Sequence, residues 1–70
     1  MMIKPGNKYV FEDGNFIEVT QVKSGEFNGE NTQIVTYNIG GPRNLPRKLV
    51  MEVNEFISNF GHLFEVNDNQ

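Results

Sequence analysis

The stretch that decides the fold is FIEVTQVK, residues 16–23. Its apolar residues Ile17 and Val19 alternate with polar neighbours, which is typical of a strand with one buried face. Val22 is out of phase with these two residues, so we expect a β-bulge, one extra residue, near Gln21. The stretch therefore predicts a strand of an antiparallel sheet.

Turn signals and a second strand surround this stretch. Asp13-Gly14 predicts a hairpin with a type I′ turn, because such turns need positive φ, and it would join residues 16–23 to a first strand at 8–11. Residues 24–31 are polar and glycine-rich, which predicts a loop or a distal hairpin tip. Residues 32–39 alternate well and predict another strand, ended by Gly40-Gly41-Pro42 because proline cannot donate to a sheet ladder.

Residues 45–60 have two interpretations. One is a single helix over 46–60, with the apolar stripe Leu49, Val53, Phe56, Ile57 and Phe60. The other is a strand over 47–52, with Leu49 and Met51 facing inward, and then a short helix that Asn54 caps and Gly61 stops after Phe60. We favour the second, because asparagine is a strong N-cap and a weak residue in a helix interior.

Residues 62–66 are expected to form a last strand after the short helix. The order of four strands, one short helix and a fifth strand predicts a mainly β fold, a small SH3-like antiparallel β-barrel with the helix near its C-terminus. The chain has 70 residues, enough for one small domain over 1–70. Its polar ends, 1–6 and 67–70, are expected to be loosely ordered.

Composition narrows the class of protein further. The chain has no cysteine, which excludes a disulfide scaffold, a cysteine-ligated zinc site and a thiol nucleophile. Apolar runs are too short to span a bilayer, and the N-terminal residues lack the apolar stretch of a signal peptide, so we expect a cytoplasmic protein. A core this small rarely stabilises a fold alone, so self-association, as a homo-oligomer, or a partner is expected.

Several short motifs together resemble small bacteriophage proteins of SH3-like type, many of which have no known function. The residues that carry the resemblance are Lys4-Pro5-Gly6, Tyr9, Asp13-Gly14, Ile17, Val19, Val22, Val35-Thr36-Tyr37, Glu55-Phe56-Ile57 and Phe60. The resemblance implies a phage or prophage accessory protein, present in the host bacterial cytoplasm. It transfers no functional residue to this chain.

The sequence does not predict an enzyme. Its one histidine is His62 and its serines are Ser24 and Ser58; Ser58 and His62 have i, i+4 spacing, but Gly61 is expected to break the helix between them. Neighbouring carboxylates, such as Glu52 and Glu55, are better explained as solvated groups than as a catalytic pair. No metal-ligand spacing is present, and no cofactor is expected.

Five residues are the candidate binding residues: Phe27, Arg43, Asn44, Arg47 and Lys48. Phe27 stands alone in a polar segment, either folded over the end of the barrel or exposed as an anchor for a partner. The other four form a polar, cationic loop, for which a solvated connection is the simpler interpretation. We expect a non-catalytic module that binds a host or phage protein and modulates or blocks it.

Two other functions stay open. One is nucleic-acid binding through the same basic loop, although a net charge of −3 and a pI near 4.9 argue against non-specific binding to phosphates. The other is capture of a small ligand between the subunits of an oligomer, which predicts a ligand-dependent rise in melting temperature.

Overall fold

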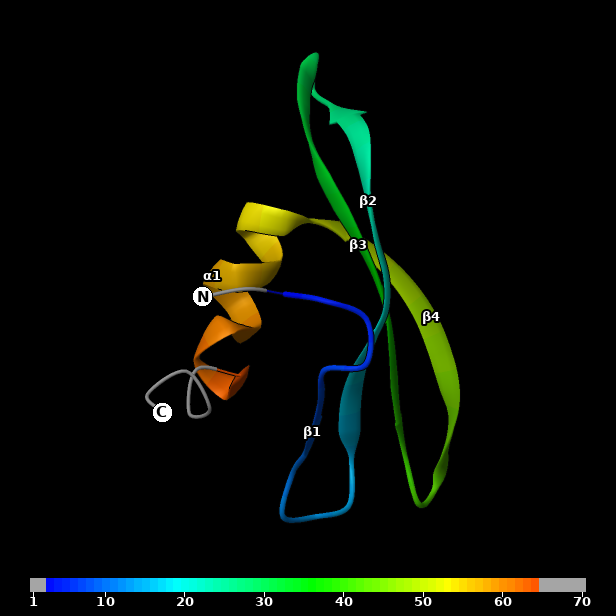
Figure 1. Cartoon of the computed structure of the whole chain (residues 1–70). Helices are drawn as coiled ribbons and strands as arrows, with labels where there is room; N and C mark the ends of the chain where they lie inside the picture. Colours follow the sequence, from blue (N-terminus) through cyan, green and yellow to red (C-terminus); the bar gives the residue numbers. More distant parts are fainter. Residues whose placement is uncertain (1–2, 65–70) are drawn as a thin grey trace.

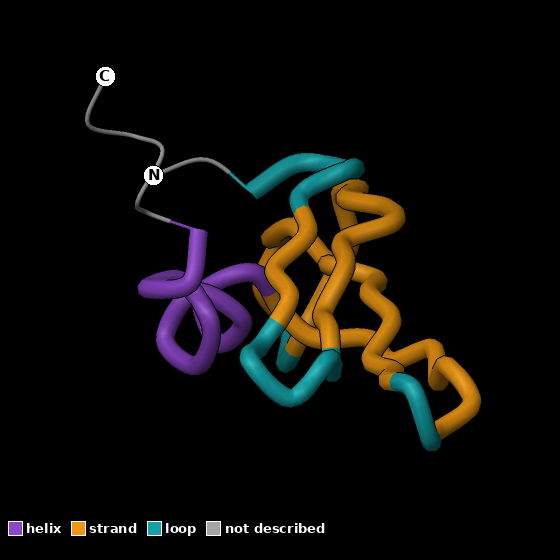
Figure 2. The backbone as a smooth tube through the Cα atoms, turned by 90° about the horizontal axis from the view of Figure 1, so that it is seen from below, coloured by secondary structure: helices purple, strands orange, loops and turns teal. Residues whose placement is uncertain are grey.

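The structure, a computed structural model, describes residues 3–64 as a four-stranded antiparallel sheet and one helix (Figure 1). The strands lie side by side in chain order, and the helix lies against one face of the sheet (Figure 2). The elements are β1 (Lys8–Val10), β2 (Phe16–Phe27), β3 (Glu30–Gly41), β4 (Asn44–Glu52) and α1 (Val53–Phe64).

The mainly β class is confirmed, whereas no closed barrel forms in the described part of the chain. The sheet is open, with β1 and β4 at its two edges. The fifth strand expected at 62–66 is wrong for residues 62–64, which belong to α1, and residues 65–66 lie outside the described range, as do 67–70. Among the described residues no strand joins the two edges.

The core lies between the sheet and α1. Its buried residues come from β2, β3, the helix and the N-terminal segment, and Phe56 of α1 is fully enclosed. The Phe56 ring meets the Tyr37 ring edge-on at 5.1 Å between centroids and lies 5.2 Å from that of Phe60, the offset geometry that aromatic pairs prefer. The buried set is Ile3, Ile17, Val19, Val35, Tyr37 and Phe56.

The bulge predicted near Gln21 is confirmed. Val19 pairs with Tyr37, but the next pair is Gln21 with Thr36, so Thr20 is the extra residue. The insertion returns Val22 to the face of the sheet that α1 covers, opposite the buried Val35. A single extra residue therefore keeps the apolar residues of β2 on one face.

The two glycine turns differ from the prediction. The β1–β2 turn is not type I′: only Gly14 has positive φ (92°), and the Phe11 N–H bonds to the Asn15 carbonyl at 2.7 Å. The two-residue turn with positive φ at both positions is Asn28 (53°) and Gly29 (81°), between β2 and β3, as a type I′ turn requires. Of the two expectations for 24–31, the distal hairpin tip is therefore confirmed and the loop is wrong, because the turn has only these two residues.

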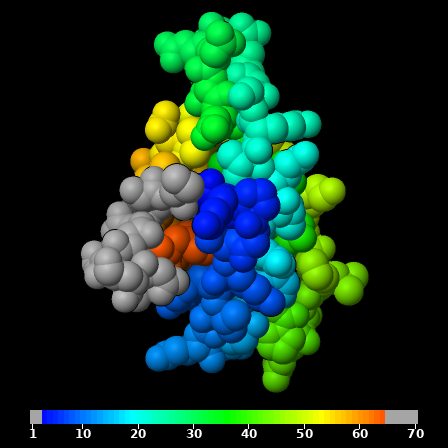
Figure 3. Space-filling view, viewed as in Figure 1, coloured from blue at the N-terminus to red at the C-terminus, as the bar shows by residue number. Residues whose placement is uncertain are grey.

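The β2–β3 hairpin projects beyond the body of the molecule (Figures 1 and 3). We call its residues 23–34 the arm. They form the far halves of two 12-residue strands, and no residue of the arm is fully buried. The arm continues the sheet past the region that α1 covers.

The strand predicted over 47–52 is confirmed inside β4, so the alternative of one helix over 46–60 is wrong. Leu49 and Met51 pack against the core as expected. The helix, however, begins at Val53 and continues to Phe64, so Asn54 is not its cap and Gly61 does not stop it. Apolar contacts of Leu63 and Phe64 with the core outweigh the cost of about 1 kcal/mol for a glycine in a helix.

The segment before β1 lies against β2. Ile3 is buried in the core, the Gly6 N–H donates to the Val19 carbonyl at 2.9 Å, and the Val19 N–H donates to the Asn7 carbonyl at 2.8 Å. These hydrogen bonds continue the pairing of the β2 edge beyond β1, as far as the bulge. Among residues 3–64 no helix is long and apolar enough to cross a membrane.

Candidate binding surface

The predicted binding residues lie at the two ends of β3. Phe27 pairs with Glu30 at the tip of the arm, while Arg43 lies in the turn after Gly41, at the other end of the strand. A 12-residue strand spans about 36 Å at roughly 3.3 Å per residue. The Phe27 end and the Arg43 end therefore form two separate surfaces (Figure 1).

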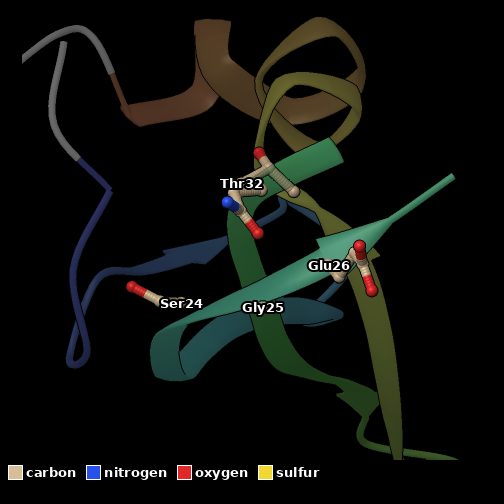
Figure 4. A pocket seen from close by; sticks show the side chains of 5 residues that line it. Ser24, Gly25, Glu26 and Thr32 are labelled. Atoms are coloured by element: carbon tan, nitrogen blue, oxygen red, sulfur yellow. The ribbon is translucent and has the colours of Figure 1, made fainter. Parts of the chain in front are cut away.

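Phe27 is exposed. Its side chain is 45% accessible, which decides between the two interpretations of this residue: it is not folded over the end of the sheet. The nearby depression is lined by Ser24, Gly25, Glu26, Asn31 and Thr32, and the labelled Ser24 and Glu26 side chains point in different directions (Figure 4). Phe27 itself lines a second depression, whose polar side chains include Thr32 and Glu52.

Three of the other four predicted residues lie together. Arg43, Asn44 and Arg47 line an open depression of about 560 Å³. Lys48 does not join them, because consecutive strand residues point to opposite faces: Arg47 shares a face with Leu49, while Lys48 shares the other with Val50. The remaining lining residues are Asn15, Ile39, Gly40 and Leu45.

Two glycines of β3 shape this depression. A Cβ on Gly40 would lie 3.0 Å from the Phe16 ring, and a Cβ on Gly41 would overlap the Asn15 side chain. Asn15 is in turn held by Asp13, whose carboxylate accepts bonds from the Asn15 N–H at 3.0 Å and from its Nδ2 at 2.8 Å. The sequence analysis missed Asn15; the signal was an Asp two residues before an Asn in a glycine turn.

The chemistry of the depression is cationic and partly apolar. Arg43 and Arg47 carry permanent charges, and each guanidinium has five donors in a planar fork that matches a carboxylate. Ile39 is half-buried and Leu45 is 87% exposed, so an apolar side chain of a ligand has surface to contact. The two arginines and the apolar surface beside them favour an acidic ligand with apolar neighbours.

A second polar centre, at Glu52, joins the arm to the helix. Its carboxylate accepts bonds from the Thr32 hydroxyl at 2.7 Å, from Asn54 Nδ2 at 3.1 Å and from the Glu55 N–H at 3.2 Å. Glu52 is thus the N-cap that the sequence analysis assigned to Asn54. The Thr32 hydrogen bond is the main reason that the pKa of Glu52 is lowered, and bonds from the backbone of Asn54 and Glu55 add to it.

The groups considered for catalysis lie on the helix surface. Because α1 is continuous through Gly61, Ser58 and His62 are neighbours one turn apart, contrary to the expected break. Both are exposed, and His62 lies in the last turn, where the helix dipole favours a cation. Within residues 3–64 no three histidine or acidic side chains gather into a possible metal site.

Comparison of the chain with family models, with curated proteins and with solved structures found no match.

Proposed function

We propose that this chain is a non-catalytic binding module that recognises an acidic segment of a partner protein. The observation that carries the proposal is the pairing of Arg43 and Arg47 on one open depression with Ile39 and Leu45. Two guanidinium groups beside apolar surface suit a segment in which carboxylates and apolar side chains are close together.

The lining of the depression suits binding of a ligand better than catalysis. Its lining includes Gly40, which has no side chain, and Asn15, which Asp13 holds in place. Residues on a turn that a rigid sheet supports are the usual position of a binding site. When a partner binds at this depression, the domain acts on it by covering part of the partner's surface.

The resemblance to bacteriophage SH3-like proteins supports one context for this binding, that of a phage or prophage accessory protein acting in the bacterial cytoplasm. In that context the partner is a host or phage protein, which the module modulates or blocks. Phe27 offers a second contact about 36 Å away along β3, so a partner that uses both must be long enough to reach both ends of the sheet.

The test is capture of proteins from a bacterial lysate on the immobilised chain, with and without nuclease. We expect a dominant protein that resists nuclease, that is lost with the double variant R43E/R47E, and that is retained with K4E/K23E, which has the same net charge. A complex that the R43E/R47E variant keeps contradicts the proposed surface.

The nuclease-treated sample distinguishes protein binding from the second candidate function, nucleic-acid binding. Material lost after nuclease treatment, with an affinity that falls steeply with salt and a slope that R43A/R47A reduces, would point to nucleic acid instead. If neither the treated nor the untreated lysate yields a bound protein, a small ligand between subunits becomes the better hypothesis, tested by a rise in melting temperature.

A further inference from the structure

β4 is the longer of the two strands at the edges of the sheet. β4 has nine residues and pairs with β3 on one side only. On this strand Val50 is 63% exposed and Leu45 is 87% exposed, and Figure 1 shows no element beyond it. Unpaired strand edges are templates for another strand, unless the protein protects them.

The sequence of β4 is complementary to itself. Residues 48–52 read KLVME, and an antiparallel pair of such stretches centred on Val50 places Lys48 opposite Glu52 of a second copy at both ends. Leu49 then lies opposite Met51, and Val50 opposite its own counterpart. Opposite charges and β-branched residues are favourable cross-strand pairs.

Both faces of the sheet fit this register. Leu49 and Met51 pair with Tyr37 and Val35 of β3, so they lie on the face that α1 covers, where they are only half-buried. In the register centred on Val50 they would contact the same two residues of the second copy and extend the core across the junction. The other face would receive the Val50 pair and the two charged pairs.

The groups that normally protect an edge do not oppose this pairing. Pro46, which lacks an N–H, lies outside residues 48–52. Lys48, a residue that blocks many edges, meets a carboxylate instead of another lysine. The Glu52 carboxylate already accepts bonds from Thr32, Asn54 and the Glu55 N–H, so the Lys48 ammonium group of a second copy would be attracted to it mainly by its charge.

We propose that two copies of this chain associate through β4, antiparallel and centred on Val50, to form one continuous eight-stranded sheet with a two-fold axis. Other registers bring the cations of β4 closer together: centring on Lys48 places two ammonium groups directly opposite each other. The paired stretch excludes Arg43 and Arg47, so the dimer leaves the proposed binding surface free on each copy.

A single cysteine tests the register, because the chain has none of its own. Only a residue on the two-fold axis pairs with itself, so V50C should form an interchain disulfide under mild oxidation. The matched control is L45C, on the same strand and more exposed, which the register places away from its counterpart. Cross-linking of V50C at least tenfold faster than L45C is expected; equal rates would overturn the proposal.

Sedimentation equilibrium tests the charged pairs without any new bond. The unmodified chain should show a concentration-dependent dimer, and K48E should raise its dissociation constant at least tenfold, because each added carboxylate faces Glu52 of the other copy. K4E, with the same change of charge outside the sheet, should dimerise as the unmodified chain does. A monomer at every concentration up to about 1 mM, or an unchanged constant for K48E, contradicts the proposed interface.

Discussion

The two halves of the β2–β3 hairpin share the same strands but not the same environment. In the near half, Val19 and Val35 are fully buried under α1, and Tyr37 is 3% exposed. In the arm, the same ladder continues through pairs such as Ser24 with Gln33, where both side chains are exposed. The backbone pairing is alike, and only the side-chain cover differs.

This difference separates two sources of stability. A buried large apolar side chain contributes about 1.5–3 kcal/mol, whereas a hydrogen bond adds about 0.5–1.5 kcal/mol net. The near half has both contributions. The arm depends on its ladder, on the Asn28-Gly29 turn and on the Thr32 bond to Glu52, so it should open locally before the body unfolds.

The largest effect is expected from Phe56→Ala. Removing this enclosed ring should cost about 3–5 kcal/mol, comparable to the whole stability of a domain of this size. Phe27→Ala, on the exposed arm, should change the free energy of unfolding by less than about 0.5 kcal/mol. Urea denaturation followed by circular dichroism measures both, and equal losses would remove the distinction between the two halves.

Two of the three glycines with positive φ in residues 3–64 give the next comparison. Gly14→Ala should cost about 1–2 kcal/mol from backbone strain, and its new methyl group would also lie 3.0 Å from Pro42. In Gly29→Ala the new methyl group meets no atom within 4 Å. Backbone strain is then the only cost, and opening of the arm relieves part of it. We expect a smaller global loss for G29A, with faster amide exchange confined to residues 23–34; uniform acceleration would show that the arm and the body open together.

The Glu52 junction predicts a pH dependence. Since the pKa of Glu52 is lowered from its ordinary value of 4.5, the folded state favours the carboxylate. Its contribution to stability is present above about pH 4.5 and is lost as the pH falls through the lowered value. The melting temperature of the unmodified chain should therefore fall more steeply below pH 4.5 than that of E52Q, while E26Q, on the arm, keeps the original slope.

The smallest effect is expected at the base of the arm, from Thr32→Val. The replacement keeps the shape of the side chain and removes the hydroxyl that donates to Glu52 at 2.7 Å. Because this bond is the main cause of the lowered pKa, the pKa of Glu52 should rise toward its ordinary value. A carbon-detected NMR titration of the Glu52 carboxyl measures the shift, and an unchanged value would mean that the backbone donors suffice.

The strands and the bulge were predictable because their signals are local. Alternation over 16–23 indicated which face is buried, and the phase of Val22 indicated the extra residue. The Asp13-Gly14 signal gave the turn but not its type. Asn28-Gly29 carried the stronger type I′ pattern, but the polar residues around it left a loop and a hairpin tip as alternatives, because strands that project into solvent lack alternation.

The helix and the open sheet depended on contacts that no short stretch contains. Gly61 is a good stop signal by itself, but Leu63 and Phe64 continue the apolar stripe and pack on the core, so the helix proceeds and no fifth strand forms at 62–64. At the proposed binding surface, the closeness of Arg43 and Arg47 was predictable from their spacing in the sequence. The division of the basic residues between two faces, with Lys48 apart from Arg47, followed only from the register of β4.

The register shift at Thr20 bears on how the chain can change in length. Deleting Thr20 would remove the unpaired residue and leave Val19 and Gln21 opposite consecutive partners, Tyr37 and Thr36, so every flanking side chain would keep its face. Deleting Lys23, in a regular stretch, would exchange the faces of the residues on one side of it. Of the positions in β2, Thr20 is therefore the one at which related sequences could have one residue fewer and still form the same sheet.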